Sequence, residues 1–143
     1  MSADGCVFCA IGAGAAPASV VHADDTVVAF MDIQPATTGH LLIIPRAHAE
    51  GLADLDPELG RRLFATAQML AGALRRSRGV RCDGVNLFLA DGEVAFQEVS
   101  HVHLHVVPRW PDDGFLIDAR WRCRPRNELD ETAAAVRAAL GGQ

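Results

Sequence analysis

The chain has 143 residues, which is enough for one domain with a hydrophobic core and too few for two ordinary domains. Its 13 Lys and Arg against 18 Asp and Glu leave a net charge of −5, which argues against nonspecific binding to a nucleic-acid polymer. The N-terminus lacks the basic start of a signal peptide, and the longest aliphatic stretch, residues 41–44, is too short to span a membrane. We therefore expect a cytoplasmic protein with no membrane partner, in which cysteines are more often metal ligands or free thiols than disulfides.

The first half of the chain predicts a connecting loop and three strands. Residues 12–18 are rich in Gly and Ala and contain Pro17, which is typical of a loop. Two short apolar runs, 19–23 and 26–32, flank a pair of aspartates and predict a β-hairpin. The apolar run 40–45 predicts a third strand that is covered on both faces.

A long helix, two strands and a second helix follow. Asp56 can cap the first helix, with Pro57 at its first position and apolar residues recurring at helical spacing: Leu59, Leu63, Ala67, Leu70 and Leu74. Strands are predicted over 85–90 and 99–108, separated by a loop at 91–96, and Asn127 can cap the last helix. This order predicts an α+β fold, a mainly antiparallel sheet of about five strands with a central helix and a C-terminal helix.

Three histidines alternate with apolar residues in the run His101-Val102-His103-Leu104-His105-Val106-Val107. Alternate residues on a strand lie about 6.6 Å apart, so the outer two imidazoles are separated by about 13 Å. That span is too long for one metal ion with metal–nitrogen bonds of about 2.0 Å, so we expect the three histidines to have different roles. One can be a nucleophile while its neighbours orient it or transfer protons. The simpler alternative is a solvated polar strand face that is rich in histidine.

Cys6 and Cys9 have the Cys-x-x-Cys spacing of metal ligands, but one pair supplies only half of a tetrahedral zinc site. The residues alone allow completion by Cys82 and Cys123 or by histidines. The alternative is an exposed, reduced pair at a frayed chain end.

The histidine run resembles the signature of the histidine triad (HIT) superfamily of nucleotide hydrolases and transferases, His-φ-His-φ-His-φ-φ with φ apolar, at every position. Residues 29–35, residues 39–48 and Gln97 also resemble family landmarks, and residues 6–9 resemble the N-terminus of the zinc-containing bacterial Hint-like branch. The resemblance implies a HIT domain over residues 1–110 with an N-terminal zinc-binding segment. Residues 111–143 would then form a C-terminal extension with a helix.

The resemblance also implies an activity, namely hydrolysis or transfer at the α-phosphorus of a purine nucleotide conjugate such as a phosphoramidate or a dinucleoside polyphosphate. His103 would be the nucleophile that forms a nucleotidyl-histidine intermediate, His105 would contact the phosphate and assist the leaving group, and His40 would support them. The implied nucleotide-binding residues are Asp32, Ile33, Asn86, Gln97, Glu98, Val99 and His105. The implied ligands of a structural zinc ion are Cys6, Cys9, His48 and His101.

Two positions depart from the family pattern. Phe96 and Glu98 stand where the family often has Gly and Ser or Thr, and a carboxylate beside a phosphate would repel it. Either Glu98 points away from the phosphate and only its backbone amide binds it, or the phosphate site differs. Two other functions also stay open, a nucleotide-binding regulatory module with little turnover and a metalloenzyme whose catalytic zinc is held by two strand histidines. Members of this branch are usually homodimers, and the helix face at Leu59, Leu63 and Leu70 would serve either as an interface or as core.

Overall fold

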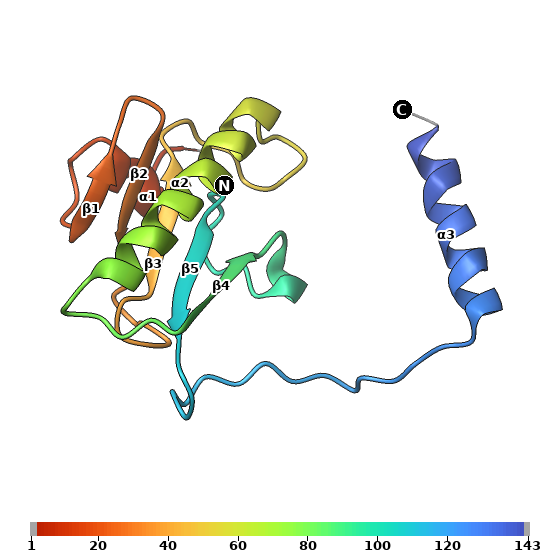
Figure 1. The fold of residues 1–143 in the computed structure, drawn as a ribbon. Coiled ribbons are helices and arrows are strands. Elements are labelled where there is room, and N and C mark those ends of the chain that lie inside the picture. Colours follow the sequence, from red (N-terminus) through yellow and green to blue (C-terminus); the bar gives the residue numbers. More distant parts are fainter. Residues whose placement is uncertain (1–2, 142–143) are drawn as a thin grey trace.

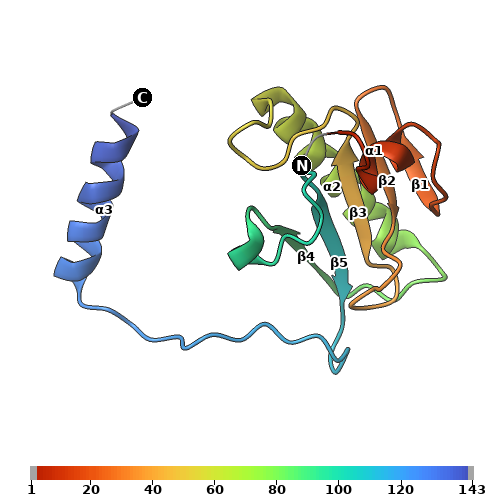
Figure 2. The same cartoon turned by 180° about the vertical axis from the view of Figure 1, so that it is seen from behind.

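The computed structural model describes residues 3–141, and Figures 1 and 2 show its fold from opposite sides. Five antiparallel strands form one sheet in the order β1–β2–β3–β5–β4. The strands are β1 (Val20–Ala23), β2 (Val27–Met31), β3 (Leu41–Pro45), β4 (Gly84–Leu89) and β5 (Leu104–Arg109). The helices are α1 (Val7–Gly12), α2 (Pro57–Arg76), a short 3-10 turn η1 (Glu93–Ala95) and α3 (Arg126–Leu140). The predicted α+β class is confirmed.

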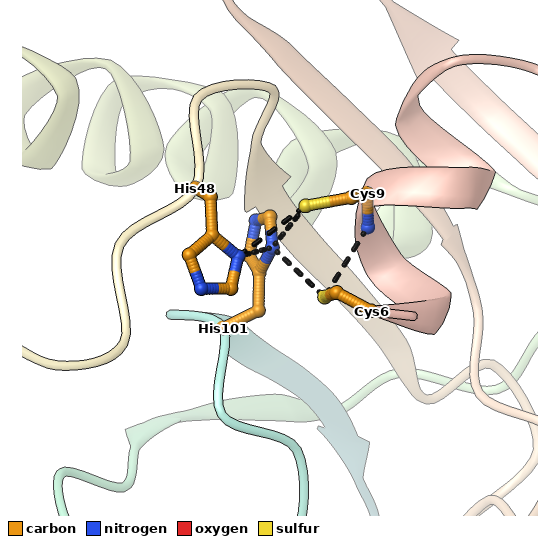
Figure 3. A group of neighbouring side chains, drawn as sticks. All are labelled: Cys6, Cys9, His48 and His101. Carbon is orange, nitrogen blue, oxygen red and sulfur yellow. Dashed lines mark hydrogen bonds between the residues drawn. The ribbon is translucent and has the colours of Figure 1, made fainter. Parts of the chain in front are cut away.

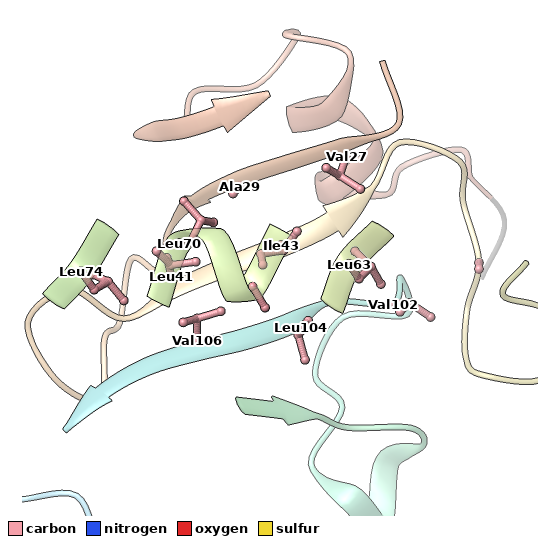
Figure 4. Close-up of a cluster of buried hydrophobic side chains, with 12 residues drawn as sticks. Val27, Ala29, Leu41, Ile43, Leu63, Leu70, Leu74, Val102, Leu104 and Val106 are labelled. Atoms are coloured by element: carbon pink, nitrogen blue, oxygen red, sulfur yellow. The ribbon is translucent and has the colours of Figure 1, made fainter. Parts of the chain in front are cut away.

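The sheet is covered on both faces at its centre. Helix α2 packs its buried face, which includes Leu63 and Leu70, against apolar side chains of β2, β3 and β5 (Figure 4). A second cluster, on the other face, joins Phe8 of α1 to Phe30 and Ile44. Every residue of β3 is buried, as its continuous apolar sequence predicted. The helix face at Leu63 and Leu70 is therefore intramolecular core.

Helix α2 begins where the sequence predicted, because the Asp56 carboxylate accepts a hydrogen bond of 2.8 Å from the backbone N–H of Glu58. Other boundaries differ. Strand β5 begins at Leu104 rather than at residue 99, so His101 and His103 precede the strand. Helix α3 begins at Arg126, with Pro125 rather than Asn127 at the N-cap position, because the backbone is already helical from Arg126 and is extended at Pro125, where ψ is 147°. Helix α1 is an element that the sequence analysis did not predict.

The C-terminal segment lies apart from the rest of the molecule. The chain after β5 makes a turn and then runs as an extended strap to α3, which stands away from the sheet in both views (Figures 1 and 2). None of the residues of α3 is buried. No helix within residues 3–141 is both long and apolar enough to cross a membrane.

Candidate active site and metal centre

Two cysteines and two histidines from three separate segments meet beside α1 (Figure 3). The Cys9 sulfur lies 3.3 Å from Nδ1 of His48 and 3.4 Å from Nδ1 of His101. The two imidazole nitrogens are 3.2 Å apart, and the Cys6 sulfur is 3.5 Å from Nδ1 of His101. Tetrahedral zinc with bonds of about 2.3 Å to sulfur and about 2.0 Å to nitrogen places its donors roughly 3.3–3.8 Å apart. The four side chains therefore fit a structural zinc ion.

The surroundings of His101 orient it as a ligand. Its Nε2–H donates to the backbone carbonyl of Pro45 at 2.8 Å, which leaves the lone pair of Nδ1 facing the two sulfurs. The ring is fully buried, and this burial lowers its pKa, so the neutral form that binds metal is favoured. Four protein donors leave no open coordination position, which is the arrangement of a structural site.

The other completions of the Cys-x-x-Cys pair do not occur. The Cys82 thiol donates to the carbonyl of Gly84 at 3.3 Å, and Cys123 is exposed on the C-terminal strap. Cys6 is only 7 % exposed, so the alternative of an exposed pair at a frayed end is wrong. The residues alone could not choose between these partners, because the choice depends on how loop 46–56 and residue 101 pack against α1.

His103 is held so that one ring nitrogen can react. Its Nδ1–H donates to the backbone carbonyl of His101 at 2.7 Å, so the lone pair is on Nε2. The ring packs edge-on against Phe8, with centroids 5.1 Å apart, and is 5 % exposed. A neutral imidazole with a fixed tautomer is a competent nucleophile near pH 7.

A hydrogen-bond chain fixes the opposite tautomer on His105. The backbone N–H of Ala36 donates to Nδ1 of His40 at 3.0 Å, so His40 carries its proton on Nε2. That Nε2 is 2.9 Å from Nδ1 of His105 and donates to it, so His105 carries its proton on Nε2. The carboxylate of Asp32 is 3.6 Å from Nε2 of His40 and completes this cluster. His103 therefore presents a lone pair and His105 a proton donor, with ring centroids 4.9 Å apart.

Both members of the supporting pair titrate below the ordinary range of histidine. Burial lowers the pKa of His105 to about 4, with the neighbouring His103 and His40 acting in the same direction. Burial also lowers the pKa of His40, although the Asp32 carboxylate opposes this shift. Both imidazoles are therefore neutral at pH 7 in the free protein.

We expect the folded state to lose stability as the pH falls from about 6.5 towards 4. A histidine whose pKa is lowered on folding binds its proton more readily in the unfolded chain, so its contribution is present above the unfolded pKa and is lost below it. Urea unfolding of the wild type and of His105→Asn at pH 7 and pH 5 measures this effect. The asparagine keeps an acceptor for His40 and does not titrate, so its pH dependence should be shallower; an equal slope in both proteins would contradict the assignment.

Two cavities adjoin His103 and His105. The smaller, of about 300 Å³, is lined by Phe30, Asp32, Ile33 and Val99. The larger, of about 510 Å³, is lined by Phe88, Phe115 and other apolar residues. His103, His105 and Glu98 line both cavities, so the two histidines adjoin two separate spaces that are large enough to receive parts of a small ligand.

Two of the expected nucleotide-binding side chains are engaged elsewhere. Asn86 accepts a hydrogen bond of 2.7 Å from Arg109, and neither histidine cavity is lined by it. The amide of Gln97 accepts from Gly92 at 2.8 Å and donates to the carbonyls of Glu50 and Val99 at 2.6 and 3.1 Å. In this conformation Gln97 holds the loop between η1 and β5 in place. Contact of either residue with a nucleotide stays a prediction.

Arg109 and Phe115 are residues that the sequence analysis missed. Arg109 pairs with the buried carboxylate of Asp113 at 2.6 Å, donates to the carbonyl of Phe115 at 2.6 Å and lies 4.7 Å above the Phe115 ring. Arg109 and the backbone N–H groups of Trp110 and Phe115 hold the pKa of Asp113 well below its usual range. The turn after β5 is thereby pinned so that Phe115 forms part of the larger cavity wall. Only the spacing of Arg109 and Asp113 hinted at this pair.

In the five-stranded antiparallel sheet, the His-x-His-x-His segment leads into β5, which is fourth in the strand order. This fold and this segment together define a histidine triad protein. The family model for the HIT domain matches residues 13–112, and the chain belongs to this family. It is 41 % identical over 110 residues to an uncharacterized HIT-like protein of Borreliella burgdorferi, covering 77 % of this chain and 79 % of that one. It is 32 % identical over 131 residues to the adenylylsulfatase HINT3 of Arabidopsis thaliana, covering 92 % and 65 % of the two chains. A zinc-bound histidine triad family protein from Mycobacterium smegmatis superposes with a TM-score of 0.75 at 39 % identity, covering 99 % of both chains.

Proposed function

We propose that this protein is a nucleotide hydrolase or nucleotidyltransferase that acts at the α-phosphorus of a purine nucleotide conjugate through His103. The observation that carries the proposal is the pair of opposite tautomers, a lone pair on Nε2 of His103 beside a proton on Nε2 of His105. Membership in the HIT family and the name of the Arabidopsis relative, an adenylylsulfatase, support nucleotide chemistry.

The proposed reaction has two steps. Binding of a phosphate anion beside His105 favours its protonated form, because an opposite charge raises the pKa of an imidazole. The second proton is then on Nδ1 of His105, so the Nε2–H of His40 turns from that nitrogen to the Asp32 carboxylate, which lies 3.6 Å away. Nε2 of His103 then attacks the phosphorus, the bond to the leaving group breaks, and the leaving group takes the proton from Nε2 of His105. In the second step water attacks the nucleotidyl-histidine, returns a proton to His105 and releases a mononucleotide such as AMP. While the bond between phosphorus and Nε2 exists, the His103 ring is positively charged, and the carbonyl of His101 stabilises this charge through the hydrogen bond from Nδ1.

Incubation with an adenosine phosphoramidate, followed by mass spectrometry of the intact protein, tests this mechanism. A nucleotidyl adduct on a histidine, with release of mononucleotide, is the expected result. Nucleotide binding without an adduct or a product would instead indicate a regulatory module with little turnover.

The smaller cavity is the proposed nucleoside site. Asp32 lines it. One of its oxygens accepts a hydrogen bond from the backbone N–H of Gln34 and the other lies 3.6 Å from Nε2 of His40, and a further lone pair of this carboxylate can accept from a ribose hydroxyl. Ile33 is 95 % exposed at the rim, where an apolar side chain can pack on a base. The backbone of Glu98 and Val99 adjoins the histidines and is the proposed phosphate contact.

We expect Glu98→Gln to lower the KM for an anionic nucleotide conjugate by about three- to tenfold, because Glu98 lines both cavities and a carboxylate that faces the bound phosphate would repel it. Steady-state kinetics at low salt measure the change, with Glu58→Gln on the exposed start of α2 as the control. An unchanged KM would mean that the Glu98 carboxylate points away from the bound phosphate.

Phe96, the other departure from the family pattern, is 88 % exposed with a left-handed φ of 70°, a conformation that glycine adopts without strain.

We also propose that the Cys6, Cys9, His48 and His101 cluster binds zinc in solution and that the protein forms homodimers. The zinc-bound relative supports the first proposal and the donor geometry supports it independently. Strand β4 is an open edge of the sheet, and α2 exposes Phe64 and Met69, so both elements offer surface for a second copy.

A further inference from the structure

Phe8 lies between the two cysteines of the metal cluster, in the first turn of α1. The Cys6 sulfur caps this helix by accepting a hydrogen bond from the backbone N–H of Cys9, at 3.4 Å. The Phe8 side chain leaves the same turn and packs against Phe30 of β2, where it is buried. Because the three residues share one helical turn, any displacement of the two cysteines also displaces the Phe8 ring.

The Phe8 ring packs against two members of the histidine triad at once. Its centroid lies 5.1 Å from that of His103 and 6.0 Å from that of His101, with interplanar angles of 77° and 78°. Both pairs are edge-to-face, the arrangement that the quadrupoles of aromatic rings favour. One apolar side chain therefore adjoins both a residue of the metal cluster and the proposed nucleophile.

The other restraints on the His103 ring leave its tilt undetermined. Its Nδ1–H donates to the carbonyl of His101, and its centroid lies 4.9 Å from that of His105. A single hydrogen bond fixes the position of one ring atom but not the plane of the ring. The rings of Phe8 and His105, which flank His103, therefore determine where its Nε2 points.

The metal cluster reaches His103 by two routes. The first runs through the main chain of His101, whose Nδ1 faces the sulfurs of Cys6 and Cys9 while its carbonyl accepts from His103 (Figure 3). The second runs through the Phe8 ring. Phe8 is neither a candidate metal ligand nor a reactive group, so a substitution can remove the second route and leave the first intact.

We propose that Phe8 is a positioning residue, which transmits the geometry of the metal cluster to His103 and holds its Nε2 toward the two cavities. Loss of the Phe8 ring would leave the four metal donors and the His101 carbonyl in place but would allow the His103 ring to tilt. A ring pair of this kind shifts a local equilibrium by about three- to tenfold. The positioning does not depend on the proposed nucleotide chemistry, whereas its effect on turnover rests on that proposed function.

Hydrogen exchange at the His103 ring tests the proposal in the full-length, zinc-loaded protein. In protein labelled with ¹⁵N-histidine, the Nδ1–H of His103 gives an NMR signal that is absent from His103→Ala, and its exchange with water is measured. The Nε2–H of His101 is the internal reference, because the carbonyl of Pro45 and the metal hold it. We expect Phe8→Leu to accelerate exchange at His103 by about three- to tenfold, with unchanged zinc content and unchanged exchange at His101.

Phe30→Leu is the matched control. It removes a ring of the same buried cluster that pairs with Phe8 rather than with a histidine, so it should accelerate exchange at His103 less than Phe8→Leu does. Equal acceleration in the two variants would overturn the proposal, as would unchanged exchange at His103 in Phe8→Leu. Equal acceleration at His101 and His103 would also overturn it, because it would indicate a general loosening. Phe8→Met replaces Phe8→Leu if the leucine variant does not fold with zinc, since Met fills the same space without a ring.

Turnover of an adenosine phosphoramidate gives a second readout. Phe8 also lines the smaller cavity, so the loss of a simple binding contact would raise KM alone. A positioning role instead lowers kcat, by about tenfold, because attack on phosphorus requires close alignment, and Phe8→Tyr, which keeps the ring, should restore it. A raised KM with unchanged kcat in Phe8→Leu would overturn the proposal. Wild-type protein without turnover would disprove the proposed function, while the exchange measurement would still decide the role of Phe8.

Discussion

His103→Ala is expected to lower the turnover of an adenosine phosphoramidate by at least about 10⁴-fold, because no other group replaces a covalent nucleophile. Nucleotide affinity and thermal stability should change little. The ring contributes one hydrogen bond to a local carbonyl and an edge contact with Phe8, while the nucleoside cavity keeps Asp32 and Ile33. Single-turnover kinetics and calorimetric titration with AMP separate the two effects.

His22→Ala is the matched control, because His22 lies on β1 and its side chain pairs with Asp24, away from the reactive histidines. It should retain full turnover. Undiminished turnover in His103→Ala would disprove the nucleophile assignment. A parallel loss of stability and affinity in that variant would assign His103 a structural role instead.

The second large effect is expected from Cys9→Ser. The Cys9 sulfur contacts both histidines of the metal cluster, and the cluster joins α1, the loop after β3 and the start of the triad. Because metal binding contributes directly to folding free energy, loss of one ligand should cost several kcal/mol and lower the Tm by about 10 °C. Zinc content by atomic absorption and thermal unfolding by circular dichroism measure the change.

Cys82→Ser provides the comparison, since Cys82 is a half-buried free thiol outside the cluster. It should keep one zinc per chain and a nearly unchanged Tm. A wild-type protein that contains no zinc and unfolds at the same temperature as Cys9→Ser would contradict the structural role. Turnover that stops as soon as a chelator is added, before the protein unfolds, would instead favour the catalytic-zinc alternative.

Much of the fold followed from local sequence patterns. The hairpin of β1 and β2, the buried strand β3 and the capped helix α2 lie close to their predicted positions, because turn residues, apolar runs and a helical period act over a few neighbouring residues. The predicted start of β5 at residue 99 was wrong, because strand pairing depends on distant residues. Alternation of His and apolar residues is typical of a strand, but the main chain at residues 101–103 has no strand partner in β3 or β4. Hydrogen-bond pairing between strands depends on residues far apart in the sequence, so the alternation of residue types cannot predict where the pairing begins.

For the candidate site, too, some features follow from local sequence and others depend on the tertiary structure. The identity of its reactive groups is local: the histidine run and the Cys-x-x-Cys pair are visible in the chain, and the spacing already indicated that the three histidines have different roles. Their assignment is only partly local. Two of the hydrogen bonds that set which imidazole nitrogen carries the proton join residues two and four positions apart, from His103 to the His101 carbonyl and from the Ala36 N–H to His40. The other two, from His101 to the Pro45 carbonyl and from His40 to His105, join distant segments that only packing brings into hydrogen-bonding range. The sequence determined which chemical groups are available, and the tertiary structure decided that His101 joins the metal cluster, while His103 and His105 present a lone pair and a proton donor beside the two cavities that they line.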